Sequence, residues 1–245
     1  MNALFRTRVT AVARVSPGFV RVTVADPRLH RFRSFGRDQR VKIVVPGDAE
    51  PFPDQASGDP MPEPEWRARW RALPPAARPA LRTYTVAAAR PGELDLDFFV
   101  HISPGPASGW ALRASVGETL LVSGPTVDSG PRGVQWAPEA ARRVLIAGDE
   151  AAVPAIRGIL ATLGPEVRAR VVVAVEDPAD ALLDPGAGVE IELVDDLLAA
   201  LAGERAADYA WVSAETSLVA EARRVLAQVP RVQAQGYWTT GPRAD

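Results

Sequence analysis

Apolar and polar residues alternate with a period of two along most of the first half of the chain, and this pattern predicts half-buried β-strands. Glycine, proline, aspartate or serine residues separate the alternating segments. The predicted strands cover residues 5–15, 19–25, 40–45, 81–87, 93–100 and 119–123. Because six short strands follow one another without long helices between them, the pattern indicates a closed or nearly closed antiparallel β-barrel.

The second half of the chain has a different pattern, in which short apolar runs alternate with longer helical stretches. Strands that are almost wholly apolar and alternate with helices indicate a parallel sheet covered on both faces, as in an α/β domain. The predicted strands cover residues 143–147, 169–175, 189–194, 209–213 and 233–238, and the predicted helices cover residues 150–163, 195–201 and 216–229.

A turn-rich segment at residues 128–133 separates the two patterns and has no periodicity of its own. We therefore expect a barrel domain at residues 1–127, a linker at 128–138 and an α/β domain at 139–245. A second irregular segment, residues 46–79, contains nine prolines. Trp66 and Trp70 lie four positions apart there and predict a short helix at residues 65–73 within a loop whose length is typical of functional loops.

The composition narrows the possible chemistry. The chain has no cysteine and only two histidines, His30 and His101. These counts exclude disulfides, thiol nucleophiles, iron–sulfur ligation and three-histidine metal sites. Any redox or metal chemistry must therefore depend on a bound molecule. Neither histidine stands in a pattern that indicates catalysis.

The charge and the hydropathy pattern limit the expected partners and location. The net charge of −2 and the pI of about 5.8 give no electrostatic indication of nucleic-acid binding. The first residues lack the apolar core of a secretory signal, and no apolar run approaches ~18 residues. We therefore expect a cytoplasmic protein, without membrane insertion, and a monomer.

The segment Arg82-Thr83-Tyr84-Thr85 begins a predicted strand directly after the proline-rich loop. On a strand, Arg82 and Tyr84 share one face, and Thr83 and Thr85 point to the other. A flavin site needs a cation for the phosphates, an aromatic or apolar wall for the ring, and a hydroxyl or amide donor at the ring edge. These four residues offer all three, although on their own they are more typical of an ordinary exposed strand.

A second candidate segment, residues 101–111, follows an apolar strand and leads into a predicted short helix at residues 108–114. Backbone N–H groups at a helix N-terminus, beside small residues that let an anion approach, bind phosphate. Ser108 can cap this helix or donate to a phosphate, and Trp110 fits either a ligand wall or a core anchor. The alternative is a strand-to-helix turn that needs glycine and proline only for its geometry.

Six blocks in this order and spacing resemble the siderophore-interacting proteins, which are flavin-dependent ferric-siderophore reductases of the ferredoxin-reductase-like superfamily. The resemblance extends from Phe5 nearly to the end of the chain. The blocks are Asp38-Gln39-Arg40-Val41-Lys42 with Pro46; Arg82-Thr83-Tyr84-Thr85; His101 through Gly105-Pro106-Ala107-Ser108 to Trp110-Ala111; Gly124-Pro125; Ala147-Gly148-Asp149-Glu150 with Pro154; and Gly236-Tyr237-Trp238 with Gly241.

The resemblance implies that FAD lies between the barrel and the α/β domain and that NAD(P)H is the electron donor. Arg82 would hold the FAD pyrophosphate, and Tyr84 and Thr85 would meet the isoalloxazine. The cofactor-binding residues that it implies are Arg82, Thr83, Tyr84, Thr85, His101, Gly105, Pro106, Ala107, Ser108, Trp110, Gly148, Asp149, Glu150, Tyr237 and Trp238. It assigns the dinucleotide to the segment of residues 148–150, where α/β sheets bind their ligands, and places the last two residues near the flavin face.

The implied substrate is a ferric siderophore, which brings its own iron ligands. Lys42 and Arg40 belong to a matched block and are the predicted substrate-binding residues. They lie in a segment rich in arginine, residues 28–42, which is also typical of a solvated basic loop. The acidic pair Glu176 and Asp177, after the second parallel strand, favours NADH, whereas the family also includes NADPH users, so the donor stays open.

This sequence departs from the family pattern at three points. Position 87 is alanine where the flavin motif continues to a second arginine, which removes a phosphate cation unless Arg90 or Arg113 replaces it. Ala151 stands where threonine usually follows Gly-Asp-Glu, and the chain has a single lysine. Two alternatives therefore stay open: a reductase for another acceptor, and a flavin- or siderophore-binding protein that no longer uses a nicotinamide dinucleotide.

Overall fold

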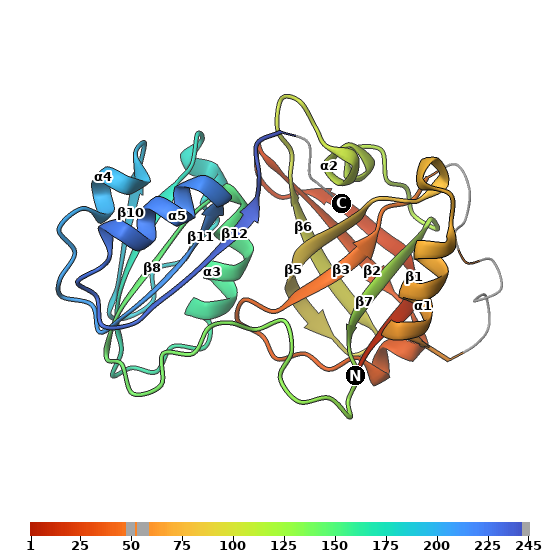
Figure 1. Cartoon of the computed structure of the whole chain (residues 1–245), viewed down its shortest axis with the longest axis horizontal. Helices are drawn as coiled ribbons and strands as arrows, with labels where there is room; N and C mark the ends of the chain where they lie inside the picture. The colour runs from red at the N-terminus through yellow and green to blue at the C-terminus, as the bar shows by residue number, and fades with distance from the viewer. Residues whose placement is uncertain (48–51, 53–58, 242–245) are drawn as a thin grey trace. The chain divides into compact units, whose positions relative to one another are not determined.

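The computed structural model describes residues 1–47, 52 and 59–241 (Figure 1). The chain folds into two compact units, Met1–Val134 and Gln135–Asp245. Within the proline-rich segment, residues 48–51 and 53–58 lie outside the described residues. Within the part of the chain that the structure describes, no helix is long and apolar enough to cross a membrane.

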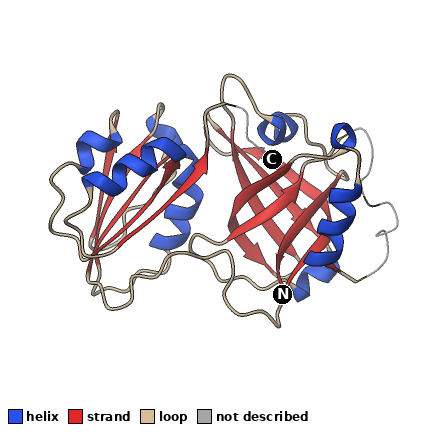
Figure 2. Cartoon of the chain, viewed as in Figure 1, coloured by secondary structure: helices blue, strands red, loops and turns tan. Residues whose placement is uncertain are grey.

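The first unit contains a closed barrel of six antiparallel strands, as predicted (Figure 2). Going round the barrel, each strand pairs with the next in the order β1-β2-β6-β5-β3-β7, and β7 pairs with β1 to close it. A two-residue strand, β4 (Met61–Pro62), adds to the far side of β1. The barrel strands are β1 (Asn2–Arg14), β2 (Phe19–Ala25), β3 (Arg40–Val44), β5 (Leu81–Arg90), β6 (Glu93–Phe99) and β7 (Thr119–Pro125).

Alternation of side chains explains why these segments close into a barrel. Along β6, Leu94, Leu96 and Phe98 belong to the buried core inside the barrel, and the residues between them face outward. Each large apolar side chain that is buried in this way contributes about 1.5–3 kcal/mol to folding. The short helix α2 (Pro106–Ala111) follows β6, and Trp110 joins the same core.

A separate apolar cluster lies on the outer surface of the barrel, beneath α1 (Glu63–Ala72). Trp66 is fully buried there, beside Leu4, Val44 and Leu121 from three barrel strands. The predicted helix at residues 65–73 exists but begins two residues earlier. Proline at the first turn fixes helical φ, and two glutamates in that turn favour the positive end of the helix dipole.

The α/β unit confirms the predicted parallel sheet. Its strand order is β10-β9-β8-β11-β12, and every neighbouring pair is parallel. The strands are β8 (Arg143–Asp149), β9 (Arg168–Ala174), β10 (Val189–Val194), β11 (Tyr209–Glu215) and β12 (Val232–Trp238). The strand order reverses between β8 and β11, so this pair forms the topological switch point at which α/β sheets bind ligands.

The helices of this unit are shorter than the sequence predicts. The segment predicted as one helix from residue 150 divides into the 3-10 turn η4 (Glu150–Ala152) and α3 (Val153–Leu160), because Pro154 occupies the first turn of a new helix. Asp196 caps α4 (Leu197–Leu201), which delays its start by two residues. Helix α5 (Thr216–Val225) ends four residues before the predicted boundary.

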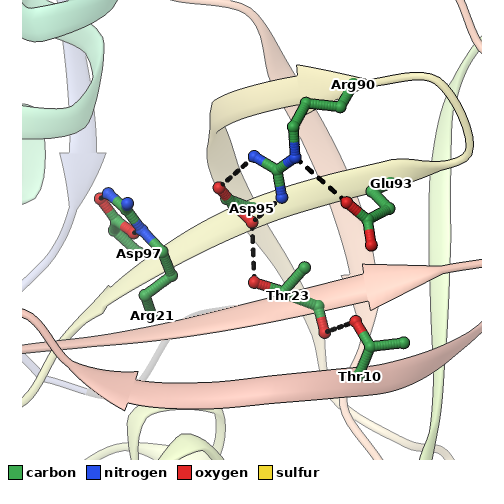
Figure 3. Close-up of polar contacts among 7 residues, drawn as sticks. All are labelled: Thr10, Arg21, Thr23, Arg90, Glu93, Asp95 and Asp97. Carbon is green, nitrogen blue, oxygen red and sulfur yellow. Dashed lines mark hydrogen bonds and ion pairs between the residues drawn. The ribbon is translucent and has the colours of Figure 1, made fainter.

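A polar network covers the outer surface of the barrel on β2, β5 and β6 (Figure 3). Arg21 binds Asp97 through two hydrogen bonds of 2.7 and 2.9 Å. Arg90 binds Asp95 in the same bidentate way, and Thr23 donates to that carboxylate at 2.8 Å. Both aspartates are buried, so the arginines compensate charges that would otherwise be costly to remove from water.

We expect the Asp95→Asn variant to lose about 1–2 kcal/mol of unfolding free energy at pH 7, because it breaks a charge-assisted pair with a partly exposed arginine. The hydrogen bonds from Arg90 hold the pKa of Asp95 below its ordinary value. This contribution is therefore complete above the pH at which the unfolded aspartate titrates, about 4, and is lost as pH falls through the folded-state pKa.

Urea denaturation of the flavin-free protein at pH 7 and pH 3 measures this difference. Glu93→Gln is the matched control, because Glu93 bonds the same arginine from an exposed position and should change stability by less than about 0.5 kcal/mol. A deficit for Asp95→Asn that is equally large at both pH values contradicts the assignment of the effect to the charged form.

Candidate functional site

Strand β5 has one half-open edge. Over residues 81–85 it pairs with β3, and its pairing with β6 begins only at Val86, next to a bulge between Val86 and Ala88. Among the described residues, no strand pairs with the other edge of β5 over residues 81–85. The edge therefore presents backbone groups to a ligand where the sequence places Arg82-Thr83-Tyr84-Thr85.

The side chains of this motif alternate between the two surfaces of the barrel wall, as predicted. Tyr84 packs toward the barrel interior, with its ring centroid 4.3 Å from that of Phe98, and burial raises its pKa. Arg82 shares this face, two positions from Tyr84, and donates to the carbonyl oxygen of Leu81 at 2.8 Å. Thr85 is buried on the other surface, opposite Arg40 of β3.

A cavity of about 630 Å³ lies between the start of β5 and helix α2. On one side it is lined by residues 45–47 and by Pro79 and Ala80. On the other side it is lined by Pro104, by four residues of α2 and its flanks, and by Arg113. Ala80 directly precedes β5, so the cavity lining ends two positions before Arg82 in the chain.

The structure corrects two predictions for the residues around α2. The helix begins at Pro106 rather than Ser108, because proline favours the first helical position. Ser108 therefore does not cap the helix, and its hydroxyl donates back to the carbonyl of Gly105 at 3.3 Å. Of the two interpretations of Trp110, the core anchor holds: its ring packs edge-on against Phe98 and its Nε1 donates to Glu118 at 3.1 Å.

The remaining residues of the second motif divide between the cavity and the solvent. Gly105 and Pro106 line the cavity, and Ala107 belongs to the core beneath it. His101 is exposed and stacks edge-on against Phe99 at 5.1 Å. It lies outside the cavity lining.

The structure distinguishes between the two arginines that could replace the cation missing at Ala87. Arg90 is bound to Asp95 and Glu93 in the outer polar network. Arg113 lines the cavity, and its Nη1 donates to the carbonyl of Gly109 at 2.7 Å. Arg113 is therefore the arginine that the fold places beside the ligand space.

The two predicted substrate residues lie on the other surface of the same wall. Strand register places Lys42 opposite Thr83, and Nζ of Lys42 donates to its hydroxyl at 3.0 Å. The same register places Arg40 opposite Thr85. Ser123, beside Lys42 on β7, has a buried hydroxyl without a hydrogen-bond partner in the described structure. The structure thus joins the predicted substrate residues to the threonines of the flavin motif.

Much of the arginine-rich segment around residues 28–42 is neutralised or satisfied locally. Arg28 pairs with Asp26 at 2.7 Å, and Arg31 pairs with Asp59 at 3.0 Å. Arg33 donates to the carbonyl of Val127. These contacts favour the interpretation of the segment as a solvated loop for those three arginines.

The second candidate site lies at the carboxyl ends of β8 and β11, at the switch point of the parallel sheet. Gly148 is packed tightly here: a Cβ at this position would stand 2.5 Å from the carbonyl oxygen of Ser213 and would overlap the Ala152 methyl group. Ser213 Oγ and Gln235 Oε1, which lie in register on β11 and β12, are buried without a hydrogen-bond partner among the described residues. Both side chains therefore have unused hydrogen-bonding capacity near this end of the sheet.

Asp149 joins the ends of β8, β11 and β12 through one buried carboxylate. Its Oδ1 accepts from the Ala151 backbone at 3.0 Å. Its Oδ2 accepts from the Glu215 backbone at 2.9 Å and from Nε1 of Trp238 at 2.7 Å. Burial, reinforced by the charge of Glu150, raises the pKa of Asp149 to about 6 against these three donors.

Glu150 and Trp238 extend the site in two directions. Glu150 accepts a hydrogen bond from the Glu176 backbone at 2.9 Å and so joins the loop after β9 to the loop after β8. The Trp238 side chain is partly exposed. Tyr237 does not join these contacts: its ring lies edge-on to that of Trp211 on β11, with the ring centroids 6.2 Å apart.

One residue of this site was missed at the sequence level. Glu215 ends β11 and caps α5, where it accepts from the backbone N–H groups of Ser217 and Leu218 and from the Ser217 hydroxyl. The hydrogen bond from the Ser217 hydroxyl, followed by those from the backbone, lowers the pKa of Glu215 to about 2. Glutamate is not among the residues preferred at an N-cap, so no capping rule indicates this contact from the sequence.

Comparison with known protein families confirms the resemblance. Residues 8–129 match the family model described as the siderophore-interacting FAD-binding domain, and residues 141–241 match that of the siderophore-interacting protein. The family model over residues 8–129 therefore confirms FAD as the predicted cofactor at the level of the family.

Two curated relatives have names that describe an activity. The chain is 33% identical over 250 residues to the NADPH-dependent ferric-chelate reductase of Escherichia coli K12, an alignment that covers 94% of this chain and 91% of the relative. It is 34% identical over 168 residues to the ferric vibriobactin reductase ViuB of Vibrio cholerae. That second alignment covers 68% of this chain and 56% of the relative's length.

Solved structures agree in fold. The siderophore-interacting protein SipS of Aeromonas hydrophila aligns over 99% of this chain and 94% of its own, with a TM-score of 0.74 and 27% identity. Phthalate dioxygenase reductase shares the fold over 98% of this chain and 70% of its own, with a TM-score of 0.62 and 12% identity. The barrel, the parallel sheet and both family matches lead to one conclusion: the chain belongs to the siderophore-interacting protein family.

Proposed function

We propose that this protein is a flavoenzyme that takes electrons from NAD(P)H and uses them to reduce ferric siderophores, releasing Fe(II). The observation that carries the proposal is the half-open edge of β5, which presents the Arg82-Thr83-Tyr84-Thr85 motif beside a cavity of about 630 Å³. The family membership and the two relatives named as ferric reductases support the same activity.

The residues around β5 fit the chemical parts of FAD. The cavity is large enough for a nucleotide-sized group and is lined mainly by proline, glycine and aliphatic residues, with Arg113 as its cation. Arg82, the second residue of β5, supplies a second cation for the pyrophosphate. The backbone edge and the two threonines provide donors and acceptors for the polar rim of the isoalloxazine.

A nicotinamide dinucleotide fits the second site. The carboxyl ends of β8 and β11 form the switch point of a parallel sheet, and the buried hydroxyl of Ser213 and amide oxygen of Gln235 have hydrogen-bonding capacity to spare. The Glu176 carboxylate follows β9, where an acid can bond a ribose hydroxyl. This position favours NADH, whereas the E. coli relative is named as NADPH-dependent.

The division of labour follows from these two sites. When bound, FAD would supply the conversion between a two-electron donor and a one-electron acceptor, so the residues of this chain need to provide orientation rather than a nucleophile. Arg82 and Arg113 hold and orient the negative phosphates, and Tyr84 fixes the strand by packing on Phe98. In the described residues, no cluster of three or more histidine or acidic side chains could hold a metal ion.

An anaerobic absorption titration tests this proposal. Protein loaded with FAD is mixed with NADH or NADPH, and then with a ferric siderophore and a ferrous indicator. Bleaching of the flavin bands by a dinucleotide, followed by recovery of the bands and Fe(II) release, is the expected result. A protein that binds no FAD overturns the proposal. We expect a cytoplasmic monomer, which size-exclusion chromatography and fractionation of the source cells test.

The alternative without dinucleotide use is favoured by one feature of the second site. At Ala151, only the backbone N–H takes part in the site, where it donates to Asp149, and the side chain has no hydroxyl for a dinucleotide phosphate. If this alternative holds, flavin stays oxidised with both NADH and NADPH although FAD is bound. A reductase for another acceptor instead gives bleaching by a dinucleotide without Fe(II) release, and quinones or redox proteins restore the bands.

Lys42→Ala is expected to raise the KM for a ferric siderophore roughly 5-fold, because it removes the cation nearest to Thr83 while leaving the flavin phosphates untouched. Flavin content should not change. Steady-state reduction of an anionic ferric siderophore measures the effect, and Arg33→Ala, a change in the neighbouring solvated loop, is the control. An unchanged KM for Lys42→Ala refutes the substrate role of this lysine.

A further inference from the structure

The Trp238 indole hydrogen-bonds a carboxylate on a strand that does not pair with its own. Strand β12 pairs with β11, and β8 lies on the opposite side of β11. Asp149 of β8 nevertheless accepts from Nε1 of Trp238 at 2.7 Å. The indole must therefore reach across the carboxyl end of β11 toward β8.

The same carboxylate is held firmly on its own side. The Glu215 backbone N–H donates to Oδ2 of Asp149, which also accepts the hydrogen bond from the indole, and the Ala151 backbone N–H donates to Oδ1. Both donors belong to the sheet end and its first turn, so the carboxylate has a fixed direction. The charged groups around it are Glu150 in η4 and Glu215 at the end of β11, and neither is a cation that could pull it elsewhere.

The backbone that carries Trp238 is also tied to the start of α5. The Thr216 hydroxyl donates to the Trp238 carbonyl at 2.8 Å and lies 3.0 Å from the Thr239 hydroxyl. The Thr240 backbone donates to Glu215 at 3.3 Å. With the backbone fixed in this way, the hydrogen bond to Asp149 selects the direction of the indole.

We propose that Asp149 is a positioning residue that holds the Trp238 indole at the switch point, over the carboxyl ends of β8 and β11, where the ring forms one wall of the dinucleotide site. This inference rests on the proposed function of the switch point. Trp238 is 36% exposed, so one part of the ring is held by the protein and another part is open to a ligand. A held aromatic ring binds a planar base with less loss of side-chain freedom than a mobile one.

The test compares Asp149→Asn, Trp238→Phe and the double variant. Asparagine offers one acceptor oxygen where three N–H donors converge, and phenylalanine keeps an aromatic ring without the N–H group. Affinity for NAD⁺ and NADP⁺ is measured by isothermal titration calorimetry, so that no turnover is involved. Each single variant should bind the preferred dinucleotide roughly 10-fold more weakly, and the double variant no more weakly than either one.

A spectroscopic reading separates positioning from general support of the fold. The Trp238 indole N–H signal, assigned in the ¹⁵N spectrum by its loss in Trp238→Phe, should shift with pH around the Asp149 pKa of about 6. The shift should vanish in Asp149→Asn. Asp196→Asn is the matched control, because Asp196 caps α4 of the same unit and takes no part in the contacts of Asp149. This variant should leave both readings unchanged.

The possible outcomes are distinguishable from one another. Equal affinity in Asp149→Asn, tighter binding, or additive losses in the double variant overturn the positioning role while leaving the proposed function intact. A different result is wild-type protein that binds neither dinucleotide although its Trp238 signal still titrates. This result overturns the use of a dinucleotide, and with it the role of the Trp238 ring as a wall of the dinucleotide site. An indole signal that does not respond to Asp149 overturns the hydrogen bond itself.

Discussion

Replacing Arg82 by alanine is expected to weaken FAD binding roughly 10- to 100-fold, because one charge-assisted contact to a phosphate contributes about 1.5–3 kcal/mol. The side chain belongs to the second residue of β5, two positions after the cavity-lining Ala80, and it donates to the neighbouring carbonyl of Leu81. Removing it should therefore cost little stability in the flavin-free protein. Fluorescence quenching of FAD on titration with apoprotein measures the dissociation constant.

Two companion variants make this experiment specific. Arg90→Ala changes an arginine on the same strand that faces the outer polar network, so it should lower stability but not FAD affinity. Arg113→Ala should weaken FAD roughly 10-fold, because Arg113 lines the cavity in which the missing cation of position 87 is needed. Unchanged FAD affinity in Arg82→Ala removes that residue from the proposed site, and an unchanged affinity in Arg113→Ala leaves Arg82 as the main cation.

Gly148→Ala is expected to abolish measurable NAD(P)H binding while FAD binding persists. The new methyl group would stand 2.5 Å from the Ser213 carbonyl oxygen and would overlap the Ala152 methyl, and neither atom is the end of a flexible side chain. Strand β8 must therefore move relative to β11 or η4, at a cost of about 1–3 kcal/mol in the stability of the second unit. The same movement should distort the switch point at the carboxyl ends of β8 and β11.

Thermal denaturation and dinucleotide titration measure the two effects of this variant separately. Gly186→Ala is the matched control in the same unit, because a Cβ there meets nothing within 4 Å and should leave both readings unchanged. Retained dinucleotide affinity in Gly148→Ala would show that the ligand binds away from the ends of β8 and β11. A parallel loss of FAD would show that the two units do not bind their ligands independently.

The sequence predicts most of this fold because periodicity depends only on which side of a strand is buried. All six barrel strands and all five parallel strands were predicted within a few residues of their observed bounds. Helix boundaries were less accurate, since they depend on single capping residues and prolines. Pro154 divides a predicted helix, Asp196 delays another, and Pro106 starts α2 two residues early.

The candidate site was only partly accessible from the sequence for a different reason. Strand alternation correctly separated Arg82 and Tyr84 from Thr83 and Thr85. Which side chains meet across strands depends on register, and register placed Lys42 beside Thr83. The choice between Arg90 and Arg113 also depended on tertiary contacts. No spacing rule relates Asp149 to Trp238, because their contact crosses an intervening strand.

The half-open edge of β5 also bears on how the protein behaves before its cofactor arrives. A strand with free backbone donors and acceptors is a template for pairing with another chain, and proteins ordinarily cover such edges. Among the described residues, no strand covers residues 81–85 on one side. A bound flavin would cap that edge, so newly made protein in a flavin-poor cell would be the form most prone to aggregate.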